Sequence, residues 1–182
     1  MNLHSDEPEP MKVPPHNFSK SPVKEVICQY HTSGRSPVGI QIPKPYPGWG
    51  VIQDRLTDAL NMHQNESFHG LMLTYTDEFD LFPDDKPTKL ISITQEIPEI
   101  LVSRMIMGPK TEITVRGDEK GTEILVRYTL KKEKIILVFQ ATSQVDEAYS
   151  GDATLRWFEK AREDIHQLFD VMVSETLRKR CE

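Results

Sequence analysis

One apolar stripe late in the sequence constrains the fold more than any other feature. The run TLRWFEKAREDIHQLFDVMVSETLRKR, residues 154–180, repeats apolar side chains at intervals of three and four residues. The stripe consists of Leu155, Phe158, Ala161, Ile165, Leu168, Phe169, Met172, Val173 and Leu177. This spacing predicts one long helix, capped by Asp152 or Thr154, with a continuous apolar face. A helix of this kind must lie on a large apolar surface, which a sheet would provide.

The sequence before this run is typical of β-strands separated by short turns. Strands are expected at residues 21–32, 67–76, 88–95, 99–108, 111–117, 122–130 and 134–143, and the segment at 99–108 has a helical turn as its alternative. The connections at 116–121 and 131–134 are short and charged, which favours hairpins. The last three strands should therefore form an antiparallel meander.

Two further segments complete the predicted fold. Residues 33–50 contain four prolines and four glycines, which predicts a structured loop, and residues 51–63 have the apolar spacing of a short helix that ends near Gln64 and Asn65. The predicted class is α+β: a curved antiparallel sheet of about six to seven strands, with the short helix and the long C-terminal helix packed on one face. The order of elements resembles that of a helix-grip fold.

Composition divides the chain into an arm and a domain. Nine of the thirteen prolines lie in the first 47 residues, and residues 1–21 have almost nothing apolar to bury. We expect residues 1–21 to be a disordered or extended proline-rich arm. Residues 22–182 have the length of a single domain with its own core.

Charge and hydropathy disfavour several classes of protein. The net charge is −6, and the 22 basic residues are scattered, so a nucleic-acid partner is not expected. The first residues contain no apolar core of the kind a signal peptide needs, and no window approaches the roughly 18 uncharged apolar residues of a membrane span. We therefore expect a soluble, cytoplasmic protein. The two cysteines are too few for a disulfide framework. Cys28 is expected to be buried in a strand, and Cys181 to be an exposed thiol.

Two stretches carry a resemblance to a known family. SPVKEVICQYHTS at residues 21–33 places a proline and an apolar residue before Glu-Val and a β run. WFEKAREDIHQLFDVMVSETLR at residues 157–178 has an acidic or histidine residue followed by isoleucine and then phenylalanine. They resemble the opening strand and the closing helix of a sporadically distributed prokaryotic family of conserved proteins with no assigned function. The middle of the chain matches only in kind, and the resemblance implies no reaction and no catalytic residue.

The stretch DEFDLFPDD at residues 77–85 holds five carboxylates in nine residues. An EF-hand loop starting at Asp77 would need an oxygen ligand where Phe79 stands, so the match fails. We expect a strand that ends after Tyr75, followed by a loop anchored by three apolar side chains and by an aspartate turn. The anchors are Phe79, Leu81 and Phe82. An acidic rim for a partner, and a metal or acid/base site, are the alternatives.

Aromatic residues define a second candidate surface. YPGWG at residues 46–50 places Tyr46 and Trp49 among prolines and glycines, where each either anchors the loop to the core or contacts a partner. Together with four aspartates they form the expected interaction surface. The aspartates are Asp77, Asp80, Asp84 and Asp85.

Other polar patterns favour structural roles. His63, Glu66 and His69 are metal-ligand types, but on a helix their spacing would not let the three side chains converge. Arg104, Arg116 and Arg127 recur in predicted strands, where they either bind an acidic group or pair with neighbouring glutamates such as Glu112 and Glu123.

The motifs of common enzymes are missing. GxSxG, GxxxxGK[ST] and GxGxxG do not occur, so no cofactor or metal is expected. The leading hypothesis is a non-enzymatic binding or interaction module that contacts a protein partner or a second copy of itself. The alternative is a small hydrophobic-ligand binder or an enzyme. A cavity of roughly 300 Å³ or more between the sheet and the C-terminal helix would favour the alternative, and a filled core beneath that helix would favour the module.

Overall fold

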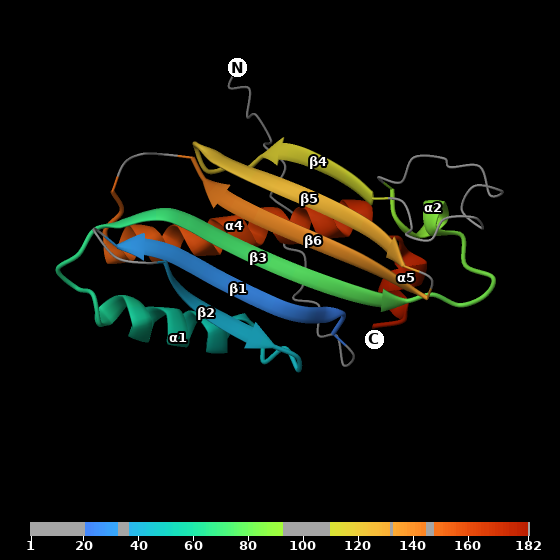
Figure 1. Cartoon of the computed structure of the whole chain (residues 1–182), viewed down its shortest axis with the longest axis horizontal. Helices are drawn as coiled ribbons and strands as arrows, with labels where there is room; N and C mark the ends of the chain where they lie inside the picture. The colour runs from blue at the N-terminus through green and yellow to red at the C-terminus, as the bar shows by residue number, and fades with distance from the viewer. Residues whose placement is uncertain (1–20, 33–36, 93–109, 132, 145–147, 182) are drawn as a thin grey trace, which may run out of the picture.

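One antiparallel sheet with helices against one face makes up the part of the chain that the structure describes, as predicted (Figure 1). The structure is a computed structural model, and it describes residues 21–32, 37–92, 110–131, 133–144 and 148–181. The strands are β1 (Val23–Thr32), β2 (Val38–Pro43), β3 (Phe68–Asp80), β4 (Lys110–Arg116), β5 (Thr122–Lys131) and β6 (Lys134–Ser143). Their order is β2-β1-β3-β6-β5-β4, and the sheet does not close into a barrel. The expected meander of the last three strands is confirmed.

Alternation of side chains gives the sheet two different faces. In β1 the side chains of Val26, Cys28 and Tyr30 are buried, and β5 and β6 alternate in the same way along their lengths. The buried side chains face the helices and form the core, because successive residues of a strand point to opposite faces. We call this the inner face, and the face without helices the outer face.

The helices cover the inner face, and the longest of them runs behind the sheet in Figure 1. They are α1 (Trp49–Asn61), α2 (Pro87–Leu90), α4 (Gly151–Met172) and α5 (Glu175–Lys179). Helix α4 buries the side chains of Trp157, Phe158, Ala161 and Ile165. None of the described helices combines the length and the apolar character that a membrane crossing requires.

Two details of the predicted C-terminal helix are wrong. Its N-cap is Ser150, whose hydroxyl oxygen accepts a hydrogen bond from the Ala153 N–H, and not Asp152 or Thr154. The helix is also interrupted, because Val173 is extended and forms a β-bridge with Ile91. Ser174 then caps α5 by accepting a hydrogen bond from the Leu177 N–H. The apolar spacing continues through the break, so periodicity alone cannot reveal it.

Two predicted elements have a different structure. Residues 87–90 form the short helix α2 where a strand was expected at 88–95, and Pro87 occupies its first turn, where a missing N–H is tolerated. The expected loop at 33–50 contains the strand β2, which lies at the edge of the sheet, where a proline such as Pro43 removes no ladder hydrogen bond. The predicted strand at 99–108, with Arg104, and nearly all of the predicted arm lie outside the described residues.

Candidate ligand-binding pocket

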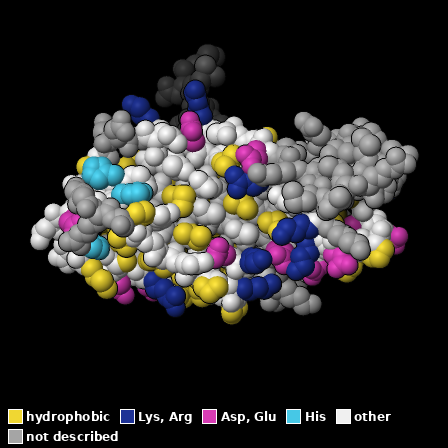
Figure 2. Space-filling view, viewed as in Figure 1, with side chains coloured by type: hydrophobic (Ala, Val, Ile, Leu, Met, Phe, Trp, Pro, Cys, Tyr) yellow, Lys and Arg dark blue, Asp and Glu magenta, His cyan; other side chains and the backbone are white. Residues whose placement is uncertain are grey.

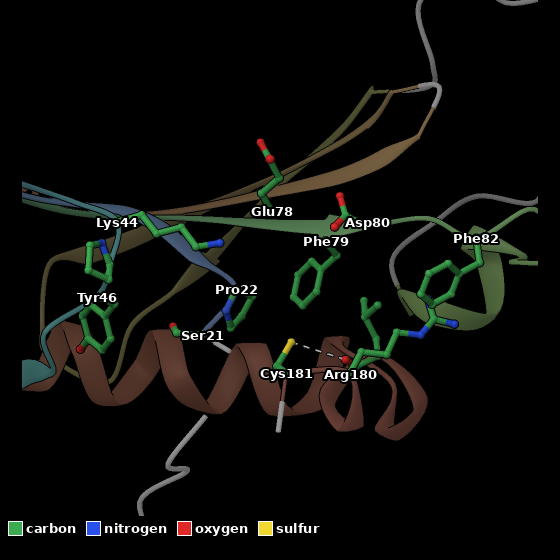
Figure 3. Close-up of a pocket in the computed structure, with 12 residues that line it drawn as sticks. Ser21, Pro22, Lys44, Tyr46, Glu78, Phe79, Asp80, Phe82, Arg180 and Cys181 are labelled. Atoms are coloured by element: carbon green, nitrogen blue, oxygen red, sulfur yellow. Dashed lines mark hydrogen bonds between the residues drawn. The ribbon is translucent and has the colours of Figure 1, made fainter. Parts of the chain in front are cut away.

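The acidic stretch does not begin a loop, because β3 continues to Asp80. It is held there by antiparallel pairing with β6, which extends to the pair Asp80 and Lys134. The expected strand end after Tyr75 is therefore wrong. Alternation sends Phe79 to the inner face and Glu78 and Asp80 to the outer face, and Figure 3 shows the two carboxylates pointing away from Phe79.

Asp77 is buried within the sheet and does not belong to an exposed rim. Its side chain lies on the inner face, opposite Val23 of β1 and Leu137 of β6, and only 3% of the residue is exposed. Burial raises the pKa of this carboxyl to about 7. No other described residue forms a hydrogen bond or an ion pair with it. At neutral pH the group is therefore partly protonated.

The outer-face carboxylates pair with lysines. Glu78 lies 3.1 Å from the ammonium of Lys24 and also accepts a hydrogen bond from Lys134. These hydrogen bonds, led by that from Lys134, lower the pKa of Glu78. Asp80 is 3.9 Å from Lys134 and largely exposed. The charges at this end of the outer face therefore compensate one another.

Asp85 joins the turn after β3 to the end of α5. Both of its carboxylate oxygens accept hydrogen bonds from the Arg180 guanidinium, at 2.6 Å each, and one also accepts from the Phe82 N–H at 2.7 Å. The Arg180 guanidinium also stacks over the Phe82 ring, 4.5 Å from its centroid. The hydrogen bonds from Arg180 lower the pKa of Asp85. Asp84, its neighbour, is exposed.

A pocket of about 480 Å³ lies between this turn, the start of β1, the segment after β2 and α5 (Figure 3). Six residues give it apolar walls, namely Pro22, Pro45, Tyr46, Phe79, Phe82 and Leu177. The peptide bond between Lys44 and Pro45 is cis. The volume falls in the range of small-molecule sites.

Lys44 supplies the available positive charge at this pocket. Its side chain is exposed and extends toward Pro22 and Phe79 in Figure 3. It makes no ion pair or side-chain hydrogen bond with any other residue that the structure describes. Arg180 also lines the pocket, but its guanidinium is held by Asp85.

The structure separates the residues of the expected interaction surface. Tyr46 and Asp80 line the pocket, and Asp85 reaches it only through Arg180. Trp49 is partly buried against the core, and the Arg162 guanidinium lies 5.5 Å from the centroid of its ring. Trp49 is the first residue of α1, and its packing against the core agrees with the structural alternative for this aromatic. Tyr46 lines the pocket, and its ring also packs edge-on against Tyr75 with centroids 6.3 Å apart.

Sequence reasoning missed most of the pocket. Lys44 lies in the segment that the sequence predicts as a loop. Its position between Pro43 and Pro45 is the sequence signal for a rigid, exposed cation. Arg180 is the last residue of the basic run at 178–180. Basic residues are common at the C-terminal ends of helices, so the sequence does not single this arginine out. Cys181 also lines the pocket and is buried, so the prediction of an exposed thiol is wrong.

The remaining candidates do not form a metal cluster. The His63 Nδ1 lies 3.1 Å from a Glu66 carboxylate oxygen just after α1, whereas His69 lies in β3. Within the described ranges no group of three or more histidine, cysteine, aspartate or glutamate side chains is arranged to hold a metal ion. Arg127 pairs with Glu112 at 2.7 Å across β5 and β4, which was the structural alternative for the strand arginines.

A filled core beneath the C-terminal helix would favour an interaction module, and a cavity between the sheet and that helix would favour a ligand binder. The structure meets each criterion in part. Phe158, Ile165 and Met172 are buried, so the core beneath most of α4 is filled. The pocket lies beyond it, where α5 meets the end of the sheet. The chain matches no protein-family model, no curated protein and no solved structure, so its resemblance to the family of conserved prokaryotic proteins stays a prediction.

Proposed function

We propose that this chain is a non-enzymatic, cytoplasmic binding protein whose pocket holds a small amphipathic molecule with an anionic group. The observation that carries the proposal is a cavity of about 480 Å³ with apolar walls and one side-chain cation, Lys44, that no described carboxylate pairs with. An apolar ligand body removes wall surface from water, which supplies most of the affinity. A carboxylate or sulfonate near Lys44 supplies orientation.

Charge around the pocket favours an anionic ligand. The lining carboxylates of Glu78 and Asp80 point away from Phe79 (Figure 3). Both lie close to the Lys134 ammonium on the outer face. Arg180 adds no net charge, because its guanidinium donates two hydrogen bonds to the Asp85 carboxylate. An anionic group of the ligand can therefore bind near Lys44, because the nearest carboxylates already pair with other cations. A cationic ligand would have to displace those pairs.

The shape of the pocket also depends on two parts of the chain that Asp85 and Arg180 connect. Phe82 lies under the Arg180 guanidinium at the rim, and 58% of this residue is exposed. Leu177, from α5, is fully buried and also lines the pocket. Removing the Phe82 ring should therefore change ligand contact with little effect on folding, whereas removing Leu177 would damage the core.

Titration with 8-anilinonaphthalene-1-sulfonate, an amphipathic anion, tests the proposal. We expect one equivalent to bind with enhanced fluorescence and to be displaced by octanoate. Lys44→Met should weaken binding about tenfold, which corresponds to about 1.4 kcal/mol, because it removes the charge and keeps the apolar stem. Phe82→Ala should weaken it as well. Lys131→Met, at an exposed site outside the pocket, is the matched control.

Two results would count against the pocket. One is equal affinity of the Lys44→Met and Lys131→Met variants for the probe, and the other is binding that octanoate does not displace. Native mass spectrometry of the full chain, purified gently from its own host, provides a direct complement. A stoichiometric small molecule released on denaturation would support the proposal, and a second protein bound in its place would favour an interaction module.

A further inference from the structure

Two histidines face each other across neighbouring strands at the end of the sheet remote from the pocket. His31 of β1 and His69 of β3 are direct partners in the antiparallel register. Their chain neighbours Tyr30, Thr32 and Phe68 are buried on the inner face, so both imidazoles belong to the outer face. Figure 2 shows histidine side chains gathered at this end of that face.

The local backbone brings the His31 ring over β3. Directly opposite residues of an antiparallel pair have Cβ atoms about 4.5–5.5 Å apart. Gly70, next to His69, has a φ of +52° beside an irregularity in the β1 and β3 register. A Cβ at residue 70 would lie 3.0 Å from the His31 Cδ2 and 3.7 Å from its Nε2. Because residue 70 is a glycine and has no Cβ, the His31 ring can lie against β3, the strand that carries His69.

Both rings are open to a ligand. His31 is exposed and His69 is half-buried. Neither imidazole takes part in a hydrogen bond or an ion pair with another described residue. His63 differs, because its Nδ1 lies 3.1 Å from the Glu66 carboxylate. Among the histidines that the structure describes, the cross-strand pair therefore combines proximity with ring nitrogens that no described residue binds.

We propose that His31 and His69 chelate one divalent transition-metal ion, with water completing its coordination. Neutral imidazole is a good ligand for Cu²⁺, Ni²⁺ and Zn²⁺, and divalent affinities rise toward Cu²⁺. The site should therefore bind Cu²⁺ most tightly and Ni²⁺ and Zn²⁺ less tightly. Mg²⁺ and Ca²⁺ prefer oxygen ligands and should not bind there. This inference is independent of the proposed pocket, which lies at the other end of β3.

Calorimetric titration of the full chain with CuCl₂ and ZnCl₂ at pH 7.5 tests the site. We expect one equivalent of each metal. His31→Gln and His69→Gln should each weaken binding about 100-fold, because the second ligand of a chelate binds intramolecularly at high effective concentration. Both positions are on the surface, and circular dichroism checks that the variants fold. The Cu²⁺ complex should also show coupling to two nitrogens by electron paramagnetic resonance.

Two control proteins separate this site from other histidines. His63→Gln and the double variant His4→Gln/His16→Gln should bind with unchanged affinity. The proposal is wrong if either single variant at the pair binds like the parent chain. It is also wrong if the double variant in residues 1–20 removes the stoichiometric site.

Discussion

Replacing Asp77 with asparagine should stabilise the protein, and the gain should depend on pH. Asparagine has nearly the shape of a protonated aspartate but cannot ionise. Asp77 is 3% exposed on the inner face, and burial raises its pKa from 3.8 to about 7. At low pH the two side chains are both neutral, and at high pH only the aspartate places a charge in the core. The difference in unfolding free energy between the two proteins therefore isolates that charge.

The sign and the magnitude follow from proton linkage. Between pH 4 and pH 7 the folded protein holds a proton on Asp77 that the unfolded chain has lost, so the stability of the parent chain falls as pH rises. The pKa in the folded state is about three pH units above its ordinary value. At 1.36 kcal/mol per unit, the accumulated loss is about 4 kcal/mol by pH 8. Asp77→Asn escapes this loss.

Urea unfolding from pH 4 to pH 8, followed by tryptophan fluorescence, measures the difference. The variant and the parent should have similar unfolding free energies at pH 4, and the variant should gain about 4 kcal/mol by pH 8. Asp80→Asn, in the same strand but largely exposed, should show no such trend. A difference that stays constant over this range would refute the argument that burial controls the ionisation of Asp77.

Two further changes test the contacts that hold the helices. Asp85→Asn should lower the unfolding free energy by about 2 kcal/mol near neutral pH, because it weakens the two charge-assisted hydrogen bonds to Arg180. The pKa of Asp85 is lowered in the folded state, so this contribution is present above about pH 4 and is lost as pH falls further, which urea unfolding at several pH values will show. Thr122→Val should destabilise the protein by about 1–3 kcal/mol, since the buried Trp157 indole N–H would lose its acceptor at 3.0 Å, and denaturant unfolding measures this directly.

For each of these two predictions, one experimental result would contradict it. Asp84→Asn is the matched control for Asp85, because Asp84 is exposed and has no part in the contact with Arg180. Equal destabilisation by the two asparagine variants would mean that the Asp85 contact is not specific. If Thr122→Val unfolds at the same urea concentration as the parent chain, the hydrogen bond to Trp157 does not contribute measurably to stability.

Local patterns were sufficient to predict the fold class. The alternation in residues 122–130 and 134–143, with a short charged turn between them, specifies a hairpin from neighbouring residues alone. The spacing in residues 154–172 specifies an amphipathic helix in the same way. These patterns carry the information because each depends on side chains only a few positions apart.

The predictions that are wrong share a different cause. At these positions, contacts between residues distant in sequence override the local secondary-structure propensity. Residues 88–95 are rich in strand formers, yet Pro87 starts a helical turn and the Ile91 backbone pairs with Val173. The acidic residues around Asp77 disfavour a strand by local propensity. Pairing of β3 with β6 overrides that preference. The alternation of buried side chains continues past Tyr75, and it places Asp77 and Phe79 on the inner face.

The candidate pocket was the least predictable part of the molecule. Its contact between Asp85 and Arg180 joins residues 95 positions apart, and no local pattern distinguishes this arginine from its basic neighbours. Lys44 is left without a described carboxylate partner because Glu78, which also lines the pocket, pairs with other lysines of the folded chain. Sites assembled in this way are outside the reach of short motifs.

The position of α5 in the chain also fixes when the pocket can exist during synthesis. The pocket combines Pro22, before the first strand, with Leu177 and Arg180, which follow all six strands. A ribosome therefore releases the whole sheet before it releases the residues that complete the walls. Contacts so distant in sequence also form late in folding, because they require closure of a long loop. A ligand of the proposed pocket could therefore stabilise the fold only after residues 177–180 have packed against the sheet.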